Sequence, residues 1–345
     1  MNPRTPILAG MKEATALTRA GRLTEATAQI QQVLRGAGKL TNAPNKRLGQ
    51  TLRAIARGGM PEIDLPSSLA VDARLAKRSY SGPEGSREYM LFIPSVPMAG
   101  PMPVVVMLHG CTQSPEDFAA GTRMNALAEA QAHIVIYPAQ PRGANANKCW
   151  NWFRPGDQSR GQGEPAILAG ILREVLAGHP ADPKRVYVAG LSAGGAAAAI
   201  LAQEYPDLIA AVGVHSGLAA GSASDVGSAF GAMRNGAAGR IPSQRVPTIV
   251  FHGTADTTVA PANAVAVARQ GRDGTPTVTQ GRSAGGRNWH RTTMSDKGRS
   301  EGEVWLIEDA GHAWSGGSAA GSFTDPSGPD ASAEMLRFFA QHQRA

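Results

Sequence analysis

The sequence RVYVAGLSAGG occupies residues 185–195, and it decides how the rest of the chain is interpreted. Its first five residues are typical of a buried strand, and the Ala-rich stretch 196–202 that follows is typical of a helix. Between them stands Ser192, flanked at two positions on either side by Gly190 and Gly194. A strand that turns sharply into a helix leaves little room around the turn, so these neighbours must be almost without side chains. We therefore predict that Ser192 is a nucleophile on a strained turn.

A serine hydroxyl needs a neighbouring base to take its proton, and a third group to orient that base. Three histidines later in the chain are candidates for the base. His290 lies in a polar segment, and His342 lies in the last turn of the helix expected at 330–342. His312, in contrast, follows the apolar strand expected at 303–307. The carboxyl ends of parallel strands are where ligands bind in such sheets. We predict His312 as the base.

The orienting acid is expected to follow another strand of the same sheet. Asp256 comes after the strand expected at 246–251 and the turn HGTA, so it lands at the same edge as His312. Asp309 is the alternative, but it would share the histidine's own loop instead of facing it from a neighbouring strand. We predict Asp256 as the acid.

Acyl transfer also needs backbone donors for the developing oxyanion. One predicted donor is the amide of Ala193, directly after the serine. The other donor is expected from the loop HGCTQ at 109–113, which follows the strand expected at 103–108. We predict that the amide of Cys111 is this donor, and the amide of Thr112 is the alternative. Cys111 and Cys149 are the two cysteines of the chain, and they are either a disulfide or two free thiols.

Aromatic residues gather around these segments and are expected to form a pocket for the apolar acyl or alcohol portion of a substrate. Core packing is the alternative for each of them. The predicted substrate-binding residues are Trp150, Trp152, Phe153 and Trp314.

The pattern of the remaining chain predicts an α/β protein with an open, mostly parallel, doubly wound sheet. An antiparallel hairpin is expected first, at 74–80 and 87–93. The expected strands that follow are 103–108, 133–137, 185–189, 208–214, 246–251 and 303–307. The expected helices are 116–131, 164–178, 193–204, 259–269 and 330–342.

The first 70 residues differ from the rest in charge. Residues 1–60 contain ten Lys or Arg and two acidic residues, so their net charge is +8. Since the whole chain has a net charge of +7, residues 61–345 have a net charge of −1. We expect residues 1–70 to form a basic helical hairpin with a linker. This segment is either a solvated basic face or a contact to an anionic surface or granule.

The order of five motifs resembles the polyhydroxybutyrate depolymerase family of esterases, which is related to the feruloyl and acetylxylan esterases. The motifs are HGCTQ at 109–113, CWNWF at 149–153, GLSAGG at 190–195, GTAD at 253–256 and GHAWSGG at 311–317. The resemblance covers roughly residues 75–342, and it implies that the domain expected at 71–345 is an α/β-hydrolase with a triad of Ser192, Asp256 and His312. It also implies an oxyanion loop at 109–111 and a disulfide between Cys111 and Cys149.

The expected function is therefore a serine esterase that cleaves short-chain polyester or oligoester bonds. A feruloyl or acetylxylan esterase is the nearest alternative, followed by acyl transfer to an alcohol and by a binding protein on an inactive scaffold. We expect no cofactor, no metal, no nucleic-acid partner and no transmembrane segment. A recognisable secretory signal is missing, which favours the cytoplasm, whereas a disulfide and the family favour an extracellular or periplasmic location.

Overall fold

The computed structural model describes residues 74–96, 100–271 and 273–345. The expected basic helical hairpin and linker at 1–70 lie outside these residues. Within the described ranges no helix is both long enough and apolar enough to cross a membrane.

Ten strands form one sheet in the order β1-β2-β4-β3-β5-β6-β7-β10-β9-β8. The six central strands, from β4 to β10, run parallel, and antiparallel pairs close the sheet at both edges. The strands are β1 Ala76–Gly82, β2 Gly85–Phe92, β3 Met102–Leu108, β4 Ile134–Pro138, β5 Ala181–Leu191, β6 Ala211–His215, β7 Thr248–Gly253, β8 Thr275–Arg282, β9 Asn288–Asp296 and β10 Arg299–Ile307. A separate short pair joins β11 Trp314–Ser315 to β12 Thr324–Asp325.

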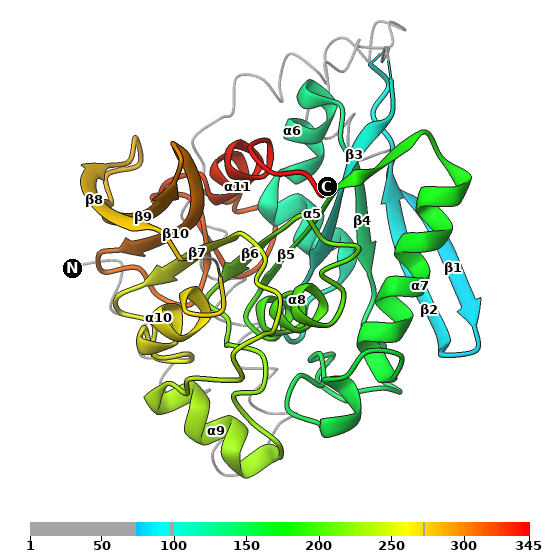
Figure 1. The fold of residues 1–345 in the computed structure, drawn as a ribbon, viewed down its shortest axis with the longest axis horizontal. Helices are drawn as coiled ribbons and strands as arrows, with labels where there is room; N and C mark the ends of the chain where they lie inside the picture. Colours follow the sequence, from blue (N-terminus) through cyan, green and yellow to red (C-terminus); the bar gives the residue numbers. More distant parts are fainter. Residues whose placement is uncertain (1–73, 97–99, 272) are drawn as a thin grey trace, which may run out of the picture. The chain divides into compact units, whose positions relative to one another are not determined.

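Helices cover both faces of the sheet (Figure 1). One apolar core lies under α7, α8, α9 and α10, and the other lies under α5, α6 and α11. The helices are α5 Pro115–Thr122, α6 Met124–Gln131, α7 Gly163–Gly178, α8 Ala193–Glu204, α9 Val226–Asn235, α10 Ala262–Ala268 and α11 Ala331–Phe339, with a 3₁₀ turn η2 at Pro155–Asp157. The central strands are buried on both faces, which explains their continuous apolar sequences.

The predicted mostly parallel α/β architecture is confirmed, with three local differences. The helix expected at 116–131 is two helices, because Arg123 adopts a left-handed conformation with φ 55° and its amide caps α5 on the carbonyl of Ala119. Two elements were not expected from the sequence: α9, whose small residues give a weak helical pattern, and β8, which has no buried position. The expected strand at 208–214 begins later, at Ala211.

Candidate active site

Ser192 lies on the turn between β5 and α8, at the carboxyl edge of the sheet. Its backbone is strained, with φ 58° and ψ −121°, and its hydroxyl makes no capping bond to the helix that follows. The amide of Ser192 donates to the carbonyl of His215 at the end of β6, at 2.9 Å. A Cβ on Gly190 would overlap the carbonyl of Gly194, and one on Gly194 would overlap the carbonyl of Leu108. The two glycines are therefore required by close backbone packing, as the turn demands.

His312 and Asp256 meet at the same edge of the sheet. The Nδ1 of His312 donates to Oδ2 of Asp256 at 2.7 Å, and Asp256 is 5% exposed. The other carboxylate oxygen accepts the amides of Thr258 and Val259, each at 2.9 Å. Burial raises the pKa of Asp256, but the hydrogen bond and charge of His312 and the Val259 amide outweigh it, so the pKa lies below its ordinary value. Asp256 is thus ionised at neutral pH and holds the imidazole with Nε2 free to accept a proton.

Two buried histidines that the sequence analysis missed support this pair. The Nε2 of His252 lies 3.5 Å from Oδ2 of Asp256 and 2.8 Å from the carbonyl of Val259. His215 accepts the amide of Ser315 on Nε2 at 2.9 Å, three residues after His312. Burial lowers the pKa of both rings, so they are neutral spacers that fix the loops around Asp256 and His312. His215 is the last residue of β6 and His252 the next-to-last residue of β7, so both lie near the carboxyl end of a parallel strand, the position that also pointed to Asp256 and His312.

The loop after β3 carries the predicted oxyanion donors. The amide of Thr112 already donates to the carbonyl of Asn147 at 2.7 Å. Within the described part of the chain, the amides of Cys111 and Ala193 make no such bond. Cys111 is therefore better placed than Thr112 to offer its N–H to a substrate. His109 beneath this loop is buried, with Nδ1 at 2.7 Å from the carbonyl of Gly110 and Nε2 accepting the amide of Gln140, and burial lowers its pKa to about 4.

The predicted disulfide between Cys111 and Cys149 is confirmed. It joins the loop after β3 to the loop after β4. The second loop is held in turn by Glu164 at the start of α7, which accepts the amide and side chain of Asn151 at 2.8 and 2.7 Å and the side chain of Gln140 at 2.5 Å. Burial and the charge of Asp157 raise the pKa of Glu164 despite these donors. No periodic pattern in the sequence predicts this polar cluster.

The structure corrects the expectation that Trp150 and Trp314 line a pocket. Trp150 is 0% exposed and donates its indole N–H to the carbonyl of His109 at 3.0 Å. Trp314 is 1% exposed, donates to the hydroxyl of Ser332 and stacks on His215. Both are core residues that brace the site from behind, because the loops that carry them fold back onto the sheet. Trp152 is also buried and packs edge-on against the half-buried ring of Phe153. These last two remain proposed substrate contacts.

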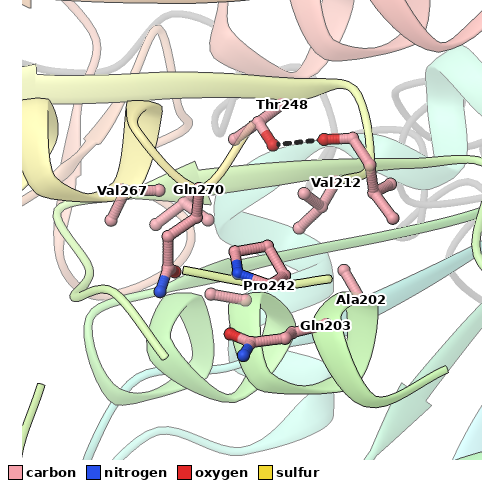
Figure 2. Close-up of a pocket in the computed structure, with 10 residues that line it drawn as sticks. Ala202, Gln203, Val212, Pro242, Thr248, Val267 and Gln270 are labelled. Atoms are coloured by element: carbon pink, nitrogen blue, oxygen red, sulfur yellow. Dashed lines mark hydrogen bonds between the residues drawn. The ribbon is translucent and has the colours of Figure 1, made fainter. Parts of the chain in front are cut away.

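A small cavity of about 20 Å³ lies away from this site, between α8, the starts of β6 and β7, and the end of α10 (Figure 2). It is lined by apolar side chains and by three polar ones, Gln203, Thr248 and Gln270. The hydroxyl of Thr248 donates to the carbonyl of Val246, and Gln270 bonds to the backbone of Ala220 and Arg240. The volume suffices for about one water molecule, so we interpret the cavity as a packing void. In the described ranges, no group of three His, Cys, Asp or Glu side chains is placed to hold a metal ion.

The strand order, the serine on the turn after β5 and the Asp–His pair at the same edge define an α/β-hydrolase fold. Among solved structures, the chain is similar to the acetyl xylan esterase from Aspergillus awamori, with a TM-score of 0.60, 19% identity and coverage of 77% of this chain and 99% of that chain. This likeness concerns the fold alone. The chain belongs to the esterase PHB depolymerase family, whose model matches residues 87–287.

Curated relatives agree with this family. The poly(3-hydroxyalkanoate) depolymerase C of Paucimonas lemoignei is 35% identical over 271 residues, covering 73% of this chain and 64% of that protein. The feruloyl esterase B of Thermothelomyces thermophilus is 33% identical over 180 residues, covering 46% of this chain and 60% of that protein. The matched regions therefore span less than two thirds of the length of these relatives.

Removing the disulfide tests its contribution to the loops. We expect the double variant Cys111→Ala/Cys149→Ala to lose about 4 kcal/mol of unfolding free energy, because a loop of about 38 residues is no longer closed in the unfolded chain. Urea unfolding of oxidised wild type and of the variant measures this difference. Dithiothreitol should lower the stability of wild type and leave the variant unchanged. Equal stability of the two proteins without reductant would contradict the prediction.

Proposed function

We propose that this chain is a serine esterase in which Ser192, His312 and Asp256 act as nucleophile, general base and orienting acid. The observation that carries the proposal is the 2.7 Å contact of His312 with a buried, ionised Asp256, at the sheet edge where the strained Ser192 stands. Parallel pairing of β5, β6, β7 and β10 supports the proposal, because the three residues follow strands that end at that edge.

The proposed reaction proceeds through an acyl-enzyme. The Oγ of Ser192 attacks the ester carbonyl carbon while Nε2 of His312 takes the hydroxyl proton. The amides of Cys111 and Ala193 donate to the oxyanion. Collapse of the tetrahedral intermediate breaks the bond to the alcohol oxygen, which leaves with the proton from His312. Water then gives a proton to His312 and attacks the acyl carbonyl carbon. Collapse of the second tetrahedral intermediate breaks the bond to Oγ of Ser192, which takes the proton back from His312 as the acid is released.

The proposed substrates are short-chain polyesters or oligoesters of the polyhydroxyalkanoate type. The similarity to a poly(3-hydroxyalkanoate) depolymerase over 73% of this chain supports this class. A feruloyl or acetylxylan esterase is the second candidate, and the matches to relatives with those names favour it. Trp152 and Phe153 are proposed to contact the substrate.

The identity of the acid is tested by paired substitutions. We expect Asp256→Asn to lower kcat by about 10⁴-fold, because an amide would hold His312 in the wrong tautomer. The control is Asp309→Asn, which changes the exposed rival carboxylate in the same way and should alter kcat less than about twofold if Asp256 alone orients the ring. Steady-state kinetics on a p-nitrophenyl ester measure both. A larger loss for the Asp309 variant would reverse the assignment.

The substrate class is tested with a panel of esters. We expect hydroxybutyrate oligomers to give a kcat/KM at least about tenfold above that of methyl ferulate, a difference of about 1.4 kcal/mol in transition-state binding. Chromatography of released acids measures both rates, and Ser192→Ala provides the background. Clear preference for methyl ferulate would favour the second candidate, and full turnover by Ser192→Ala would refute the nucleophile.

We further propose that the basic residues 1–60 bind the enzyme to an anionic surface or granule. Their net charge of +8 supports this proposal. We expect a protein lacking residues 1–60 to lose co-sedimentation with anionic vesicles at low salt while it still hydrolyses soluble esters. Raising the salt concentration should release the full chain, because electrostatic attraction is screened. Equal sedimentation of both proteins would end this proposal.

A further inference from the structure

Phe323 is an exposed aromatic residue on the segment that follows His312. Its side chain is 46% exposed, and its backbone is left-handed, with φ 52°. A bulky side chain rarely adopts that conformation, because its Cβ crowds the backbone. The exposed ring also leaves apolar surface in water. Backbone strain of this kind persists only where the surrounding structure fixes it, and it is concentrated at active sites and ligand contacts.

The carboxyl side of Phe323 is fixed to the segment of the proposed base. The carbonyl of Phe323 accepts the amide of Trp314 at 2.7 Å, and Trp314 comes two residues after His312. The next residue, Thr324, pairs with Trp314 in the short β11–β12 ladder. The hydroxyl of Thr324 also donates to the carbonyl of Ser318 at 2.9 Å. Movement of Phe323 away from the histidine segment would therefore break several hydrogen bonds.

The amino side of Phe323 is fixed to the oxyanion loop. Ser322 donates its amide and its hydroxyl to the two carboxylate oxygens of Asp117, at 2.9 and 2.6 Å. The carbonyl of Ser322 accepts the side-chain N–H of Gln113 at 3.0 Å. The side-chain oxygen of Gln113 in turn accepts the amide of Gly110 at 2.9 Å. One glutamine thus links the residue before Phe323 to the loop that carries a proposed oxyanion donor.

These two attachments place Phe323 between the proposed base and the proposed oxyanion donor. On one side, one hydrogen bond and two residues separate it from His312. On the other side, its neighbour is bonded to Gln113, which comes two residues after Cys111. The left-handed backbone cannot relax unless one of the attachments is broken. The exposed ring therefore belongs to the point where the segments of the base and of the oxyanion donor meet.

We propose that the ring of Phe323 contacts the alcohol portion of the ester bound at Ser192, and that it makes the enzyme prefer apolar alcohol groups. In the proposed reaction the alcohol oxygen takes its proton from His312, so the alcohol portion leaves on the histidine side of the site. Phe323 is joined to that side through Trp314. Contact with an apolar chain removes the surface of the ring from water. This inference rests on the proposed function and extends it to one portion of the substrate.

The test compares two series of esters with the full chain. One series lengthens the alcohol from methyl acetate to hexyl acetate, and the other lengthens the acyl group from methyl acetate to methyl hexanoate. For wild type we expect kcat/KM to rise with alcohol length. We expect Phe323→Ala to lower kcat/KM for hexyl acetate about tenfold relative to methyl acetate, and to change the acyl series less than about twofold. Titration of the released acid at constant pH measures all rates.

The matched control is Phe230→Ala. Phe230 is the other exposed phenylalanine of the described residues, at 54% on α9, so this variant removes the same ring from another surface and should leave the ratio of hexyl to methyl acetate unchanged. An unchanged ratio in Phe323→Ala, an equal change in Phe230→Ala, or a loss confined to the acyl series would overturn the inference while ester hydrolysis stands. If wild type hydrolyses neither series, the proposed function fails and the inference fails with it.

A second variant separates a substrate contact from a structural role. Phe323→Asn keeps the fold of the loop, because asparagine adopts the left-handed conformation more readily than phenylalanine does. We expect this variant to have a Tm at least equal to that of wild type and to lose the preference for hexyl acetate as Phe323→Ala does. Retention of the preference in Phe323→Asn would overturn the inference. So would a loss of preference that accompanies only those variants whose Tm falls.

Discussion

Parallel pairing of β5, β6, β7 and β10 is the constraint on which the site depends. Each of these strands is fixed by its neighbour, so their carboxyl ends stop at one edge and the loops after them must meet there. Ser192 follows β5, Asp256 follows β7 and His312 follows β10. The strand between them, β6, ends in His215, which contacts the backbone on both sides, at Ser192 and at Ser315. The spacing of the three side chains is thereby a property of the sheet.

Neutral buried polar groups hold the loops around this edge. His109, His215 and His252 are kept uncharged by burial, and they use ring nitrogens to bind backbone atoms. A charged ring in the same places would compete with His312 for Asp256 or repel its protonated form. Asp256 is thus left with His312 as its close charge partner, which is the arrangement a general base requires.

The sequence was sufficient for most of the parallel sheet and for the position of each proposed triad residue, because both depend on short local patterns. Continuous apolar segments marked the buried strands, and Ser192 and Asp256 follow two of them. The burial of Trp150 and Trp314 could not be predicted from the sequence, because an aromatic side chain next to a proposed catalytic loop can face either the pocket or the core. Only the hydrogen bonds to His109 and Ser332 decide between the two.

Three of the nine non-glycine residues with positive φ in the described part of the chain lie where the proposed chemistry needs fixed positions. Thr112, Lys148 and Ser192 are left-handed at φ 66°, 53° and 58°, and each such residue costs on the order of 1 kcal/mol or more. Thr112 and Lys148 lie on the two loops that the disulfide joins, and a backbone hydrogen bond from Thr112 to Asn147 links the same loops again. These cross-links oppose relaxation of either loop. The amide of Cys111 is consequently held without an acceptor among the described residues, so the oxyanion of the proposed reaction would bind it without first displacing a protein group.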